Sequence, residues 1–149
     1  MIKLNKIPKT YEQALSFLLQ GLDAEDIAYI RDGNNISHHG FGTAIRNTWN
    51  LWGARKGAST ALRDEFISRF KLGHADDMSG LILSHVEAIV RDEAFDPAEE
   101  VKRYHDHWRK IGVDPITQER VSEPVNTPLR DGFRLLDKFA TNVCKVIKK

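Results

Sequence analysis

Two short stretches of the chain carry the side chains best suited to chemistry, one at residues 38–53 and the other at residues 74–79. Imidazole and carboxylate groups can hold a zinc ion or activate a water molecule, and a guanidinium can grip a carboxylate or a phosphate. The candidate residues are His38, Arg46, Asn47, Trp49, His74, Asp76 and Asp77. The same residue types also build internal ion pairs, so each candidate has a structural interpretation beside the functional one.

The guanidinium of Arg46 allows two interpretations. Together with Asn47 or Asn50, its planar fork of donors can bind an external anion. Alternatively, Arg46 pairs with Asp76 or Asp77, because a half-buried charge requires a partner and these are the complementary groups available. We favour the ion pair, which would lock the two stretches together.

The two aspartates also suit the start of a helix. A carboxylate of Asp76 or Asp77 can accept an unpaired backbone N–H there, and its charge matches the positive end of the helix dipole. Two such charges oppose the binding of a phosphate at the same place. A metal or hydrolytic site built with His38 and His74 is the alternative, but the spacing does not require it and no His-Glu-x-x-His run occurs. We therefore expect no metal and no cofactor.

The aromatic and interior residues are placed by helical spacing at 100° per residue. This spacing puts Trp52 at the centre of the apolar arc of the helix expected over residues 37–52, and Trp49 on its shoulder. It predicts a buried Trp52 and an exposed Trp49 that anchors a partner. His85 falls inside the apolar arc of a later helix, where we expect a hydrogen-bonded interior histidine.

Helical periodicity and capping signals extend along the whole chain. No segment alternates with the period of two that a half-buried strand requires. The helices are expected over roughly residues 10–20, 24–32, 37–52, 59–72, 76–90, 97–111 and 127–147, the second capped by Asp23, the fifth by Asp76 or Asp77 and the sixth by Asp96. The sequence thus predicts an all-α fold of about seven helices, packed as an irregular compact bundle rather than a simple four-helix bundle.

Length, charge and cysteine usage exclude several classes of protein. A chain of 149 residues with 22 Lys and Arg against 21 Asp and Glu lacks the positive surplus of a nonspecific nucleic-acid binder. No apolar run reaches the roughly 18 residues of a membrane-spanning helix. The single cysteine, Cys144, cannot form an internal disulfide and suits a reducing compartment. We expect a soluble, cytoplasmic protein without a membrane or nucleic-acid partner.

Three stretches together resemble a small domain of unknown function found in bacteria and phages. They are Ile7-Pro8-Lys9-Thr10, His38-x-Gly40-x-Gly42-x-x-Ile45-Arg46-Asn47-x-Trp49-x-Leu51-Trp52-Gly53 and His74-x-Asp76-Asp77-Met78-Ser79. The resemblance implies a domain at residues 7–90 and makes the candidate residues above its signature positions. The chain departs from the family pattern at Ala75, where a proline is usual, and at His39, where an aliphatic or aromatic residue is usual. The resemblance therefore implies no role for His39. Residues 91–149 are then a helical extension with a long loop at about 113–126, packed on the first part.

The function that we favour is a non-enzymatic binding module for an unknown protein or a small polar ligand. Its contact border would be Arg46, Asn47 and Trp49, with the extension supplying or regulating a surface. By analogy with phage relatives, one version is a mobile-element accessory protein that acts in host takeover or counter-defence. The alternative is a small hydrolase that uses the His38, His74, Asp76 and Asp77 cluster. The amphipathic segment at 127–147 leaves a homodimer open.

Overall fold

The structure is a computed structural model that describes residue 4 and residues 6–121. Within these residues the chain forms six α-helices and two short π-helical segments, and no strand beyond an isolated bridge between Val113 and Arg120. The elements are α1 (Tyr11–Gly21), α2 (Ala24–Arg31), a π segment (His38–Gly42), α3 (Thr43–Thr48), α4 (Ala61–Glu65), a second π segment (Phe66–Phe70), α5 (Ala75–Arg91) and α6 (Pro97–Lys110). The predicted all-α class is confirmed for this part of the chain, and the predicted seventh helix at 127–147 lies outside the described residues.

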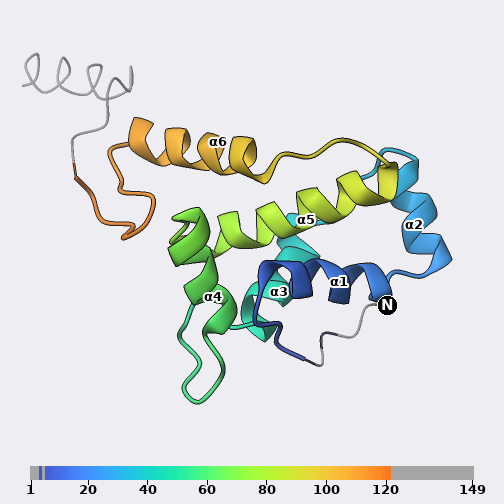
Figure 1. Ribbon diagram of the computed structural model, residues 1–149, viewed down its shortest axis with the longest axis horizontal. Coiled ribbons are helices and arrows are strands. Elements are labelled where there is room, and N and C mark those ends of the chain that lie inside the picture. The colour runs from blue at the N-terminus through green and yellow to red at the C-terminus, as the bar shows by residue number, and fades with distance from the viewer. Residues whose placement is uncertain (1–3, 5, 122–149) are drawn as a thin grey trace, which may run out of the picture.

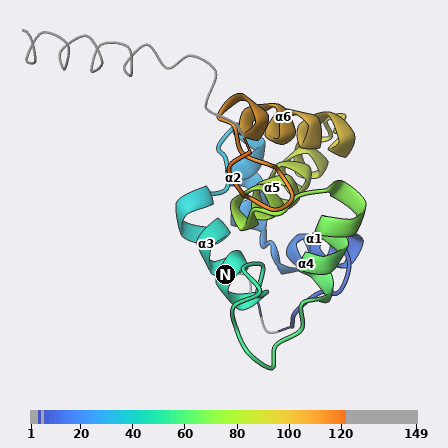
Figure 2. The same ribbon diagram turned by 90° about the vertical axis from the view of Figure 1, so that its left-hand side faces the viewer.

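Helix α5 is the centre of the core. It contacts α1, α2, α3 and α6, and its side chains Leu81, Ile82 and Val86 are completely buried. In both views α6 lies along one side of α5, whereas α1 and α3 lie on the other side (Figures 1 and 2). None of the described helices has both the length and the apolar character needed to cross a membrane. Every element that carries a candidate residue is therefore positioned against α5.

The starts of three helices follow the predicted capping signals. The hydroxyl of Thr10 accepts the backbone N–H of Gln13 at 3.2 Å, and the carboxylate of Asp23 accepts that of Asp26 at 2.9 Å. Asp96 caps α6 in the same way. Each cap satisfies a backbone donor that the helix leaves unpaired, which is why these boundaries could be predicted from sequence.

The helix predicted over residues 37–52 is wrong in its course and in its buried face. The chain begins with a π-helical turn, continues as a short α3, and leaves the helical path after Thr48 because Asn50 adopts a left-handed backbone with φ 54°. As a result Trp49 is only 1% exposed and Trp52 is 48% exposed, the reverse of the prediction. The buried face of the helix also includes Arg46, which is 8% exposed.

Asn50 organises the loop that follows α3. Its side-chain oxygen accepts the backbone N–H of Arg55 at 2.9 Å, and its amide donates to the carbonyls of Arg55 and Ser59 at 3.4 and 3.5 Å. The residue is 2% exposed, so it is not available to help Arg46 bind an external anion, as one interpretation of the sequence had proposed. Asparagine tolerates the left-handed conformation because its short polar side chain bonds to nearby backbone.

Because Trp49 is buried and Trp52 is exposed, truncating the two side chains should lower the stability of the fold by unequal amounts. Trp49→Ala removes a fully buried indole and should lower the free energy of unfolding by about 3–5 kcal/mol. Trp52→Ala, the matched control, should lower it by less than about 1 kcal/mol because half of the side chain already contacts water. Denaturant titration of both variants measures the difference. Equal losses would contradict the placement of the two indoles.

Candidate functional site

Arg46 is the point at which the two motifs meet. Its Nε atom lies 2.8 Å from Oδ1 of Asp76, and its Nη1 donates to the hydroxyl of Ser79 at 2.9 Å. Nη1 also lies 3.5 Å from the carbonyl oxygen of His38, and Nη2 donates to the hydroxyl of Thr43 at 2.8 Å. The predicted ion pair between Arg46 and Asp76 is confirmed, and it joins α3 to the first turn of α5.

This arrangement leaves little of the guanidinium for an external anion. Arg46 is 8% exposed, and four contacts occupy most of the donors that a guanidinium has. Of the two amides proposed to assist it, Asn50 is buried in the loop after α3 and Asn47 is exposed on the surface. The three side chains do not converge on a common space, so the geometry does not support the anion-binding interpretation of Arg46.

His74, not an aspartate, caps α5. Its Nδ1 atom accepts the backbone N–H of Asp76 at 3.3 Å, and Asp76 and Asp77 both fall within the first turn of the helix. The prediction that Asp76 or Asp77 caps this helix is therefore wrong. An imidazole nitrogen is an acceptor when it carries no proton, which allows His74 to take the cap and leaves both carboxylates free for other partners. Their charges still match the positive end of the α5 dipole.

Asp77 binds a tryptophan of α6. The indole nitrogen of Trp108 donates to Oδ2 of Asp77 at 2.6 Å. Burial raises the pKa of the Asp77 carboxyl above its ordinary value, and the hydrogen bond from Trp108 opposes that rise. No local signal in the sequence identifies the carboxylate that the N–H of Trp108 reaches.

The ring of His74 lies between two tryptophans. Its centroid is 5.5 Å from the ring of Trp52, which meets it edge-on, and 5.0 Å from the ring of Trp108. We call Trp52, His74 and Trp108 the aromatic row. The row begins at the exposed indole after α3, passes the start of α5 and ends on α6, so it connects three segments that are distant in sequence.

His38 reaches α5 farther along the helix, at Gly80. A Cβ atom at Gly80 would lie 2.9 Å from Cε1 of His38 and 2.6 Å from the hydroxyl of Tyr104, so both side chains pack directly over the glycine. Six residues separate Gly80 from His74, which corresponds to about 9 Å of helix rise. His38 and His74 therefore contact α5 at separate places. Among the described residues no group of three or more His, Cys, Asp or Glu side chains is placed to hold a metal ion.

His85 has the interior role that its position predicts. Its Nδ1 atom lies 2.8 Å from the hydroxyl of Tyr11, and its ring stacks on Phe95 at 4.6 Å. Burial lowers the pKa of the His85 imidazole, which favours the neutral form. The predicted hydrogen bond of His85 is confirmed, and it links α1 to α5, but the side chain is partly rather than fully buried.

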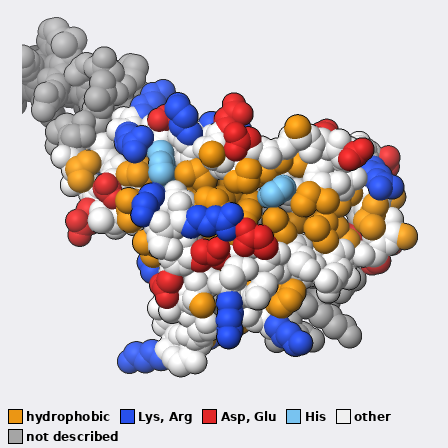
Figure 3. Space-filling model, viewed as in Figure 1, with side chains coloured by type: hydrophobic (Ala, Val, Ile, Leu, Met, Phe, Trp, Pro, Cys, Tyr) orange, Lys and Arg blue, Asp and Glu red, His pale blue; other side chains and the backbone are white. Residues whose placement is uncertain are grey.

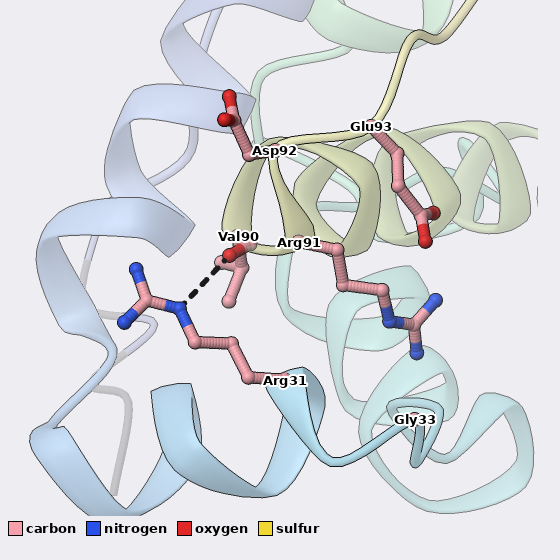
Figure 4. A pocket seen from close by; sticks show the side chains of 6 residues that line it. All are labelled: Arg31, Gly33, Val90, Arg91, Asp92 and Glu93. Carbon is pink, nitrogen blue, oxygen red and sulfur yellow. Dashed lines mark hydrogen bonds between the residues drawn. The ribbon is translucent and has the colours of Figure 1, made fainter.

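Two cavities lie at the other end of α5, near α2. One, of about 530 Å³, is lined by Arg31, Gly33, Val90, Arg91, Asp92 and Glu93. Its two guanidinium groups point in opposite directions, and Nε of Arg31 donates to the carbonyl of Val90 at 3.2 Å (Figure 4). Arg91 donates to the carbonyl of Ile30 at 3.0 Å. These arginines hold α2 to the end of α5, a contact that sequence analysis did not predict.

The second cavity, of about 290 Å³, lies beside the first π segment and is mostly apolar. Its lining residues are Leu22, Asp26, Tyr29, Ile30, Asn35, Ile36, Ser37 and Phe41. None of the seven candidate residues lines either cavity. Of the candidate residues, Arg46, His74, Asp76 and Asp77 are linked by contacts around the start of α5, Trp49 is buried, and His38 and Asn47 are exposed. Trp52 is the exposed residue next to this group, in contact with His74.

The ion pair predicts a specific loss of stability. Arg46→Ala removes a buried partner of Asp76 and Ser79 and should lower the free energy of unfolding by roughly 2–3 kcal/mol, because Asp76 keeps access to water. Lys102→Ala removes a surface pair with Asp106, in which both side chains are more than half exposed, and should cost less than about 1 kcal/mol. Chemical denaturation compares the two. An Arg46→Ala variant as stable as Lys102→Ala would rule out a structural role for the pair.

The buried carboxyl of Asp77 predicts a pH effect of known sign. Its folded pKa lies above the ordinary value of 3.8, so between these two values the folded chain binds more protons than the unfolded chain. This contribution lowers the free energy of unfolding as the pH rises through that window. Asp77→Asn keeps an acceptor for Trp108 but does not titrate. The free energy of unfolding of Asp77→Asn minus that of the native chain should therefore increase with pH above 3.8, and a constant difference would contradict the burial of this charge.

Comparison with known proteins gives one family. Residues 7–88 match the model of a domain of unknown function, DUF6794, and this match covers more than half of the chain. Neither a curated protein nor a solved structure matches the sequence. The matched region ends near the last turn of α5 and includes both motifs, the ion pair of Arg46 and the cap of α5. The chain belongs to the DUF6794 family of domains of unknown function.

Proposed function

We propose that this domain is a non-catalytic binding module that recognises another protein through the aromatic row. The observation that carries the proposal is the exposure of Trp52, 48% of whose surface is open while its ring is held edge-on against His74. Large aromatic side chains are enriched among the residues that dominate binding energy. A ring that is already fixed by a neighbour loses little conformational freedom when a partner covers it.

The polar candidates at the start of α5 support binding over catalysis because they contact groups of the chain itself. Asp76 pairs with Arg46, Asp77 accepts from Trp108, and the Nδ1 atom of His74 caps α5. A general acid or base must reach a substrate with a free lone pair or proton. The hydrolase alternative needs His38 to join these groups, but His38 packs over Gly80 instead, and we do not favour it.

The contact surface that we propose differs from the border of Arg46, Asn47 and Trp49. Trp49 and Arg46 are interior residues and cannot touch a partner. Trp52 takes the place of Trp49 as the anchor, and Asn47 remains on the surface of α3 nearby in sequence. The face in Figure 3 shows charged side chains of both signs scattered around the apolar ones, so shape and aromatic contact, more than net charge, would select the partner.

The resemblance to phage domains suggests a partner for this module. A mobile-element protein that binds a host protein through an exposed indole, without a reaction of its own, fits both the family analogy and the internal pairing of Arg46, Asp76 and Asp77. This version rests on analogy, and the binding role does not depend on it.

The proposal predicts that Trp52 is required for capture of a partner. The purified chain, immobilised and exposed to lysate of the source cells, should retain a protein that Trp52→Ala retains at least about tenfold less well, as expected for a dominant interface residue. Ile89→Ala is the matched control, because Ile89 is also an exposed apolar residue, at 44%, and lies on α5 outside the aromatic row. Quantitative mass spectrometry of the retained proteins measures the ratio. Equal capture by the native chain and both variants would reject the aromatic row as the contact.

A further inference from the structure

We propose that the motif face of α5 is a seat for an amphipathic helix, and that α6 is a resident occupant which a partner helix of the same pattern can replace. The motif face comprises His74, Asp77 and Gly80. The proposal rests on the binding function above and names the kind of partner: a helix that presents a tyrosine and, four residues later, a tryptophan.

The first observation is that the occupant lies outside the family domain. The family match ends at residue 88, whereas α6 begins at Pro97. Nevertheless Trp108 of α6 donates to Asp77 and packs on His74, and Tyr104 of α6 lies over Gly80. The domain therefore offers a formed surface to a segment that is not part of it.

The second observation is that the seat selects its occupant. Gly80 provides space for a hydroxyl, since a Cβ there would come within 2.6 Å of the Tyr104 oxygen. One turn earlier, Asp77 is partly buried and requires a donor, because a buried carboxylate without a hydrogen bond is costly. An indole N–H supplies that donor together with a large apolar surface. Recognition thus depends on a hydroxyl contact and an indole contact at a spacing of i and i+4.

The third observation is that α6 is attached through a few side chains on one face. Val101 is its only buried residue, Tyr104 packs against the core, and Nε2 of His105 lies 2.9 Å from the carbonyl oxygen of Lys71. The helix has its own N-cap, in which Asp96 accepts from the backbone of Ala98 at 2.9 Å, and an i,i+4 pair between Lys102 and Asp106 at 2.6 Å. Local contacts of this kind favour the helix even when it leaves the surface. In Figure 3 apolar side chains remain visible over the middle of α5 beside α6.

The loop after α6 adds a second attachment that a partner must overcome. The backbone N–H of Gly73 donates to the carbonyl of Pro115 at 2.9 Å, and the carbonyl of Ile116 lies where a Cβ of Gly73 would be. An occupant tethered to its own seat competes at a high effective concentration. A free helix should therefore bind weakly to the native chain and more tightly once the anchor of α6 is removed.

The test uses a synthetic peptide of residues 96–112 with a fluorophore and the full-length chain. Trp108→Ala in the chain removes the anchor, and the peptide should bind this variant at least about tenfold more tightly than the native chain, measured by fluorescence anisotropy. A peptide that carries the same Trp108→Ala change is the matched control and should not bind. A chain that carries both Trp108→Ala and Gly80→Ala should also fail to bind, because the added methyl fills the space of the tyrosine hydroxyl.

Hydrogen exchange of the native chain tests the exchangeable occupant without any substitution. The amides of α6 should exchange at least about tenfold faster than those of α5, because α6 opens without global unfolding. Equal protection of the two helices would overturn the proposal even if Trp108→Ala failed to fold. Absence of peptide binding to a folded Trp108→Ala chain would overturn it as well. Neither result would affect the capture of a partner through Trp52, so the two proposals fail separately.

Discussion

The structure depends on one buried guanidinium. Arg46 is almost closed to water, and such a charge is tolerated in a protein interior only when its donors are paired. The pairs are Asp76 and Ser79 on α5 and Thr43 on its own helix. They fix the rotation of α3 about its axis, which buries Trp49 at its end, and the left-handed backbone of Asn50 then turns the chain so that Trp52 is exposed. The position of the exposed anchor thus depends on the ion pair of Arg46 and on the turn that follows it.

The features of this fold that could be predicted from sequence are those that depend on residues close together in the chain or on a small choice of partners. Caps such as Thr10 and Asp23 bond to backbone only three residues away, so their effect does not depend on the rest of the fold. The pairing of Arg46 with Asp76 was also predictable, because few complementary charges were available to a half-buried guanidinium. The two tryptophans were assigned wrongly since a helical wheel assumes a regular helix, and the backbone leaves that path at Asn50.

The contacts of α6 were beyond such reasoning. An indole N–H can donate to many kinds of acceptor, and nothing near Trp108 in sequence points to Asp77, which lies 31 residues earlier. His74 was likewise passed over as a cap because aspartate is the commoner choice at that position. The preference for aspartate at a helix start did not decide this cap. The ring of His74, which contacts Trp52 and Trp108, places its Nδ1 atom where it accepts the backbone N–H of Asp76.

The adjacent aspartates of the second motif, Asp76 and Asp77, make two separate contacts between helices. Successive residues on a helix point about 100° apart, so Asp76 and Asp77 are directed toward different neighbouring helices. Asp76 faces Arg46 and holds α3 to α5, whereas Asp77 faces Trp108 and holds α6. Because His74 takes the cap, neither carboxylate is needed for the backbone. One turn of helix therefore stabilises the domain on one side and forms the seat of its occupant on the other, which places recognition directly beside the contact that determines the fold.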